Sequence, residues 1–228
     1  MVQPEHIILA IDTSTEHAGL ALAVGDKVSV RSWPAGRTQT TSILPAIDGM
    51  LSDAGLAPGD LSAVVVATGP GTFTGLRVGM SIAKGIVLAR GIPIIGIPTL
   101  DIAAASAPDA PDRIAILPAG RGRVVWQRFV AGDDHQPRNT TLAGFIEELA
   151  GAPDALVIGE LGEDQQAAVA AVHGRTRWEH RDPAVMIRLA SARLERGESD
   201  DPVTLEPMYL HGVVVQSGPV QDRLKRKP

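Results

Sequence analysis

The feature that most limits the fold is a run in which a buried strand, a glycine loop and a long apolar helix follow one another. The strand is expected at residues 61–68, the loop at 69–71, and the helix at 72–90. A second apolar strand is expected at 92–98. Short apolar runs bounded by Gly and Pro are typical of buried strands. Strands that alternate with helices predict an α/β fold.

The residues before this run add three strands and a helix. The first strand ends at Asp12, and a hairpin turn at Gly25-Asp26 joins the next two strands, at 18–24 and 27–33. A helix is expected at 41–56, with Gly55 as its stop. A three-stranded meander followed by helix, strand, helix and strand matches one half of an actin-like (ASKHA, ribonuclease H-like) fold.

The pattern changes near Ala107, where the Pro- and Asp-rich stretch APDAPD predicts a boundary between two lobes. Beyond it we expect a strand pair, another strand and three helices, the last of them in PAVMIRLASARLERG. The sequence therefore predicts a complete N-terminal lobe at 1–106, a reduced C-terminal lobe at 107–217 and a disordered basic tail at 218–228.

Composition excludes several classes of protein. The 228 residues are 44% hydrophobic with a net charge of −5, which excludes a disordered chain and argues against nucleic-acid binding by overall charge. There is no cysteine, so disulfides, thiolate catalysis and cysteine-bound metals are excluded. The N-terminus lacks the basic region of a signal peptide, and no apolar run is long enough to span a membrane. We expect a cytoplasmic protein without membrane contact.

Asp12, Thr13 and Ser14 close the first strand, and two interpretations of them stand about equal. An acidic side chain at the end of a strand can hold a metal-bound water, while hydroxyls on the following turn contact phosphate. Alternatively, the same side chains bond to the backbone of their own turn. Gly69 and Gly71 precede a helix N-terminus, where anions bind. Without a lysine to grip phosphates, a tight turn is the favoured interpretation of this loop.

The helix at 72–90 is apolar around most of its circumference, with Arg77, Ser81 and Lys84 forming only a narrow polar strip. A helix on a protein surface normally has a polar half. The helix is therefore expected to be covered on more than one side, either within the chain or by a protein partner. A chain of 228 residues has few other segments that could bury this helix, so we favour a protein partner.

No set of catalytic residues or metal ligands is evident. The six histidines include no pair four residues apart, and neither an H-E-x-x-H motif nor a G-x-S-x-G elbow occurs. The sequence predicts no catalytic residue and no metal site.

The stretches ILAIDTST, ILP, GPGTFTGLRVGMSIAKGI and IPTL together resemble the bacterial TsaB family. The resemblance is strong over about residues 6–105 and loose over 107–228, where EPMYL supports it. It implies a two-lobed actin-like fold without a complete catalytic site. The function implied is that of a non-catalytic dimerisation subunit for threonylcarbamoyl transfer to N6 of adenosine 37, in tRNAs that read codons starting with A.

The resemblance also implies the partners: a TsaD-type catalytic paralogue, a TsaE-type small ATPase, tRNA through the complex, and a homodimer in isolation. No cofactor is expected on this chain alone, while ATP and a metal ion are expected in the catalytic partner. Asp12, Thr13, Ser14, Gly69 and Gly71 would form a vestigial nucleotide loop. The predicted partner interface is a seam on two helices, comprising Ile43, Leu44, Ile47, Met50, Leu51, Leu76, Met80, Ala83 and Val87.

Two enzymatic functions are the alternatives to this one. An actin-like ATPase or sugar kinase needs a second phosphate loop, for which residues 157–164 (VIGELGED) are the only candidate and a poor one. A metalloprotease-like enzyme needs metal ligands that this sequence lacks. Turnover of ATP by the isolated chain would distinguish an enzyme from a subunit without activity.

Overall fold

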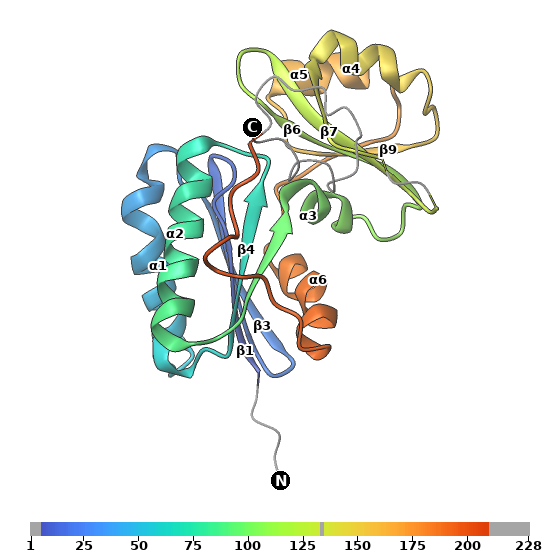
Figure 1. The fold of residues 1–228 in the computed structure, drawn as a ribbon. Coiled ribbons are helices and arrows are strands. Elements are labelled where there is room, and N and C mark those ends of the chain that lie inside the picture. Colours follow the sequence, from blue (N-terminus) through green and yellow to red (C-terminus); the bar gives the residue numbers. More distant parts are fainter. Residues whose placement is uncertain (1–5, 133–134, 210–228) are drawn as a thin grey trace, which may run out of the picture.

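Two five-stranded sheets organise the chain in the computed structural model, which describes residues 6–132 and 135–209 (Figure 1). The first sheet contains β1 (Ile7–Asp12), β2 (His17–Val24), β3 (Lys27–Pro34), β4 (Ala63–Gly69) and β5 (Ile94–Pro98), in the order β3-β2-β1-β4-β5. β1, β2 and β3 form the expected antiparallel meander, and β4 and β5 run parallel to β1 and to each other. The sequence places these five strands to within about two residues.

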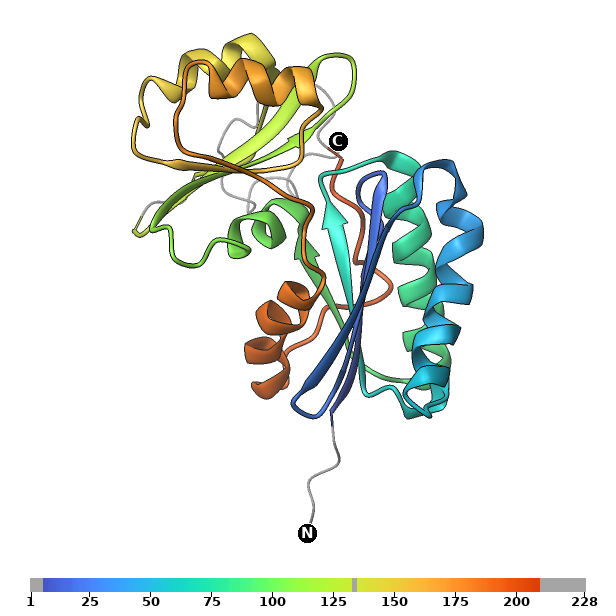
Figure 2. The same ribbon diagram turned by 180° about the vertical axis from the view of Figure 1, so that it is seen from behind.

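Helices cover both faces of the first sheet (Figures 1 and 2). α1 (Gln39–Asp53) and α2 (Phe73–Arg90) lie side by side on one face, and α3 (Thr99–Ala105) and α6 (Ala184–Glu195) lie on the other. α2 ends at Gly91, whose φ of 65° is the left-handed conformation that closes a helix. Short 3-10 turns, Gly36–Thr38 and Pro58–Asp60, precede α1 and β4.

The second sheet repeats the order of the first. It contains β6 (Asp112–Pro118), β7 (Arg123–Val130), β8 (Arg138–Thr141), β9 (Leu156–Gly159) and β10 (Thr176–Trp178), in the order β8-β7-β6-β9-β10. Here β6, β7 and β8 are the meander, and β9 and β10 run parallel to β6. α4 (Leu142–Leu149) and α5 (Glu163–Ala170) cover its outer face (Figure 1). Two such units make the actin-like two-lobed fold that the sequence predicts, and the outer strands of the second are short.

The path of the chain after β10 corrects the predicted range of 107–217 for the second lobe. α6 returns to the first sheet, where Met186, Ile187 and Ala190 are buried against its strands. The segment that follows pairs with β5, since Asp200 donates its backbone N–H to the carbonyl of Ile94 at 2.9 Å. The second lobe is thus inserted into the first. The predicted tail at 218–228 lies outside the described residues.

Candidate functional site

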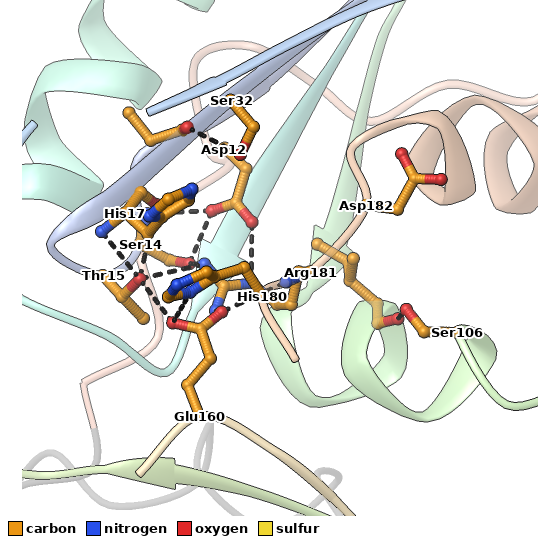
Figure 3. A network of polar contacts seen from close by, with 12 residues as sticks. Asp12, Ser14, Thr15, His17, Ser32, Ser106, Glu160, His180, Arg181 and Asp182 are labelled. Atoms are coloured by element: carbon orange, nitrogen blue, oxygen red, sulfur yellow. Dashed lines mark hydrogen bonds and ion pairs between the residues drawn. The ribbon is translucent and has the colours of Figure 1, made fainter. Parts of the chain in front are cut away.

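The candidate site lies where β1 ends, between the two lobes (Figure 3). Asp12 is the last residue of β1 and is 2% exposed. One carboxylate oxygen, Oδ1, accepts hydrogen bonds from the Ser14 backbone N–H, at 2.9 Å, and from the Ser14 hydroxyl. The Asp12–Ser14 turn therefore satisfies its own polar groups, as one of the two interpretations expects.

The other carboxylate oxygen of Asp12 binds Arg181, a residue that the sequence does not single out. Arg181 follows β10, and its side chain is 2% exposed. Its Nε donates to Asp12 Oδ2 at 2.8 Å, and its Nη2 donates to the hydroxyls of Ser14 and Thr15 at 3.0 and 3.2 Å. Its Nη1 forms a short ion pair with Glu160, which comes directly after β9. One guanidinium thus joins the ends of β1 and β9, in different lobes (Figure 3).

The electrostatics of this cluster keep its members charged. Burial alone raises the pKa of Asp12, but attraction by Arg181 and the hydrogen bonds from Arg181 and Ser14 outweigh burial and hold the pKa below 3.8. Burial likewise lowers the pKa of Arg181, and its pairs with Asp12 and Glu160 outweigh that effect and raise it. A buried charge is stable only when it is paired and hydrogen-bonded, as both groups are here.

A stacked histidine pair borders the cluster. The rings of His17, on β2, and His180 are 3.7 Å apart between centroids and 6° from parallel. His180 Nδ1 lies 3.6 Å from Glu160 Oε2. Burial, and then the neighbouring His180, lowers the pKa of His17 below 6.5. The pair is therefore most stable with His17 neutral.

The glycine loop packs against the Asp12–Ser14 turn. The Thr72 N–H donates to the Ser14 carbonyl at 2.6 Å, and a Cβ on Gly71 would lie 2.2 Å from that oxygen. The Thr13 hydroxyl donates to the Gly75 carbonyl at 2.6 Å. Gly69 has a φ of 107°, in the region that favours glycine. The structure thus brings the loop and the turn together, and these glycines serve a tight strand-to-helix turn.

Comparison with known proteins identifies the family to which the chain belongs. A family model described as "TsaD: tRNA N6-adenosine threonylcarbamoyltransferase" matches residues 34–171, more than half of the chain. The chain belongs to the TsaD family.

Curated relatives carry the TsaB name. The Escherichia coli K12 "tRNA threonylcarbamoyladenosine biosynthesis protein TsaB" is 36% identical over 125 residues, which cover 54% of each chain. The Bacillus subtilis protein of that name is 38% identical over 119 residues, 51% of this chain and 52% of the relative. The chain thus spans about half the length of the curated relatives it matches.

Solved structures from Pseudomonas aeruginosa share the fold. One, an uncharacterized protein with similarity to peptidase YEAZ, superposes with a TM-score of 0.75 at 22% identity, over 90% of this chain and 100% of its own. A second, YeaZ, gives a TM-score of 0.69 at 21% identity, over the same shares of each chain. At these identities the likeness supports the two-lobed fold.

The predicted seam is largely wrong for this member of the TsaD family. Of its nine residues, only Leu44 is exposed, at 56%. The other eight are buried in the chain's own core: Ile43, Ile47, Met50, Leu51, Leu76, Met80, Ala83 and Val87. The apolar sides of α1 and α2 face the first sheet, so burial within the chain, the alternative interpretation, accounts for them. The outer face of the two helices presents Phe73 and Leu88, 48% and 62% exposed, together with Leu44.

The part of the chain that the structure describes holds neither a cluster of metal ligands nor a membrane-spanning helix. Within residues 6–132 and 135–209, no group of three or more His, Asp or Glu side chains is placed to hold a metal ion. Over the same residues, no helix has the length and apolar character that crossing a membrane requires.

Proposed function

We propose that this chain is a non-catalytic subunit in threonylcarbamoyl transfer to N6 of tRNA adenosine 37. The observation that carries the proposal is the Arg181 guanidinium bound to Asp12. An ATPase of this fold needs the carboxylate at the end of β1 for a metal-bound water, and here both of its oxygens are committed within the chain. The names of the TsaB relatives supply the reaction in which the subunit takes part.

The chain acts, on this proposal, by binding a TsaD-type catalytic partner through the outer face of α1 and α2. Leu44, Phe73 and Leu88 expose large apolar side chains there. A Cβ added to Gly85 would meet no atom within 4 Å, so the middle of α2 is open to the close approach of a partner. Exposed apolar patches on a protein surface mark sites of interaction with partners.

The same proposal extends to the rest of the complex. The catalytic partner would carry ATP and the metal ion, and a TsaE-type ATPase and tRNA would join the assembly. The isolated chain would form a homodimer through the same outer face of α1 and α2. The proposed site of this reaction is the cytoplasm.

Reconstitution of the reaction tests this function. The catalytic paralogue, the small ATPase and the threonylcarbamoyl-adenylate synthase would be combined with tRNA, threonine, bicarbonate and ATP. Modified adenosine is then measured with and without this chain. We expect modification to depend on the chain, whose own ATP turnover stays at background in both the wild type and Asp12→Ala. Full modification without the chain would refute the function but not the fold.

The interface is tested by charge substitution. Leu88→Asp and Leu44→Asp place a carboxylate on exposed apolar positions, so we expect each to weaken partner binding by at least about tenfold, while the fold tolerates surface changes. Val172→Asp is the matched control, because Val172 is 60% exposed but lies after α5 in the other lobe. Binding is measured by calorimetry. If all three variants bind the partner with the same affinity, the interface does not lie on the outer face of α1 and α2.

A further inference from the structure

A cavity with a volume of about 510 Å³ lies between α3 and the inner face of the second sheet. Figure 1 shows α3 between the two sheets. Asp101 of α3 lines one wall, and Arg113 of β6 with Gln127 and Phe129 of β7 line the other. The cavity shares no lining residue with the Arg181 cluster. Its size is within the range of small-molecule sites in proteins.

Two oppositely charged groups in this cavity have hydrogen-bonding capacity that no described residue meets. Asp101 is partly buried, and its carboxylate makes no hydrogen bond or ion pair with any described residue. Burial raises its pKa to about 6. On the other wall, Arg113 Nη1 donates to the Ala110 carbonyl at 2.8 Å, but its buried Nε has no acceptor among the described residues.

Two further polar side chains of the cavity, Gln127 and Arg128, are already bonded. Gln127 donates to the His135 carbonyl at 2.8 Å. Arg128 binds Asp112 through two hydrogen bonds, at 2.9 and 2.7 Å. Asp101 and Arg113 therefore differ from Gln127 and Arg128 in having hydrogen-bonding capacity that is not met. A buried polar group left without a partner is destabilising, so proteins rarely keep one without a use.

We propose that this cavity binds a small molecule that carries both an ammonium and a carboxylate group, that is, an amino acid or a related zwitterion. The ammonium group donates to Asp101, and the carboxylate accepts from the Arg113 guanidinium. The Phe129 ring, whose centroid lies 6.0 Å from the Arg113 guanidinium carbon, offers an apolar surface for the carbon chain between the two charges. Charge-assisted hydrogen bonds at both ends would orient the ligand. The proposal is independent of the role in tRNA modification.

Calorimetric titration of the full chain tests the site with a series of probes. Glycine, 4-aminobutanoate and 6-aminohexanoate carry the two charges at increasing separation, while butylamine and butanoate carry one charge each. We expect at least one zwitterion to bind with a Kd below about 10 mM, and both single-charge probes to bind at least about tenfold more weakly. No heat from any zwitterion, or equal binding of butylamine or butanoate, would overturn the proposal.

Variants identify the two groups. Asp101→Asn keeps the shape of the side chain and Arg113→Lys keeps the charge, and each should weaken binding of the best zwitterion at least about tenfold. Asp109→Asn is the control, because Asp109 is an exposed carboxylate outside the cavity. Unchanged affinity in Asp101→Asn would overturn the proposal.

The pH dependence of ligand affinity is a second measurement. A purely structural role of Asp101 would leave it unchanged. Asp101 must be ionised to bind an ammonium group, so wild-type affinity should fall as the pH drops through about 6. The charged or titratable groups that also line the cavity are Arg113, Arg128 and His135. Because His135 also lines the cavity, Asp101→Asn is measured over the same range. A pH response of the same size in both proteins would assign it to another group and contradict the role of Asp101.

Discussion

Asp12 and Arg181 are 169 positions apart in the sequence, yet their side chains form the most buried ion pair among the described residues. Each charge has been removed from water, and each depends on the other to compensate for that loss. Glu160 supplies the second carboxylate that Arg181 requires. The consequence is an asymmetry: the intact cluster adds modestly to stability, whereas removal of one member leaves a buried charge without its counterion.

We therefore predict that Arg181→Met lowers the free energy of unfolding by about 3–5 kcal/mol. Arg177→Met is the matched control, since Arg177 pairs with Asp109 at 3.6 Å and their side chains are 37% and 72% exposed. Exposed pairs contribute less than about 1 kcal/mol. Denaturant titration of both variants measures the difference. Similar small decreases in the free energy of unfolding of both variants would show that Asp12 and Glu160 do not depend on Arg181 as their counterion.

The stacked histidines give a second prediction at this scale. The pKa of His17 is below 6.5 in the folded chain and returns to about 6.5 on unfolding. Between these values the unfolded chain binds more protons, so stability falls as the pH drops below about 6.5. His180, Glu160, Arg181 and Asp12 all influence this titration.

Replacement with a neutral ring, His17→Phe, should remove this part of the pH dependence. The free energy of unfolding is measured for both proteins from about pH 7.5 to about pH 5.5, and the wild type should lose more of it. An identical pH response would contradict the assignment to His17.

The sequence predicts this site only in part, for a physical reason. Asp12 and Gly71 belong to one strand end and one tight turn, which local spacing identifies. Arg181 and Glu160 arrive through the tertiary fold, from loops that carry no local pattern. Glu160 lies within the stretch considered as a poor phosphate loop, and its carboxylate instead binds a cation.

At the scale of elements, hydrophobic pattern predicts which segments become helices and strands but not how much of each surface remains exposed. The predicted helices at 41–56 and 72–90 correspond to α1 and α2. The apolar residues of α1 and α2 pack on the first sheet. The hydrophobic pattern does not show how many of these residues the chain itself will bury. α3, β8 and β10 were not predicted, because they have only 7, 4 and 3 residues and are stabilised by the sheets they contact.

Two glycines of α2 provide an internal comparison. A Cβ on Gly79 would lie 2.3 Å from the Thr13 hydroxyl oxygen, whereas a Cβ on Gly85 would meet no atom within 4 Å. We expect Gly79→Ala to destabilise the protein by about 1–3 kcal/mol through overpacking. Gly85→Ala should stabilise it by about 0.5–1 kcal/mol, the ordinary difference in a helix. Thermal unfolding measures both, and equal shifts would refute the close packing of α2 on the Thr13 turn.

At the scale of the whole molecule, the first lobe is assembled from both ends of the described chain. α6 buries Met186, Ile187 and Ala190 against strands that end almost ninety residues earlier, at β5. A buried Met or Ile side chain contributes about 1.5–3 kcal/mol, so α6 supplies a large share of the stability of the first lobe. The sequence predicts two consecutive lobes and does not predict this return. The amphipathic pattern of α6 would be the same if the helix covered the second sheet.

Truncation tests this dependence. A chain ending at Asp182 keeps the whole second sheet but lacks α6, and we expect it to be insoluble or to lose cooperative unfolding. A chain ending at Tyr209 keeps α6 and should unfold cooperatively. Cooperative unfolding of the shorter chain would show that the first sheet does not require α6.

The return of α6 also sets an order of events during synthesis. Strands β1 to β5 leave the ribosome well before α6, and chain growth at about 5–20 residues per second separates them by roughly 5–20 s. Throughout that interval α3 is the one helix available to cover this apolar face of the first sheet, and the part that α6 will cover stays open. The nascent chain therefore presents a surface to chaperones, and to other nascent chains, that the finished protein never exposes.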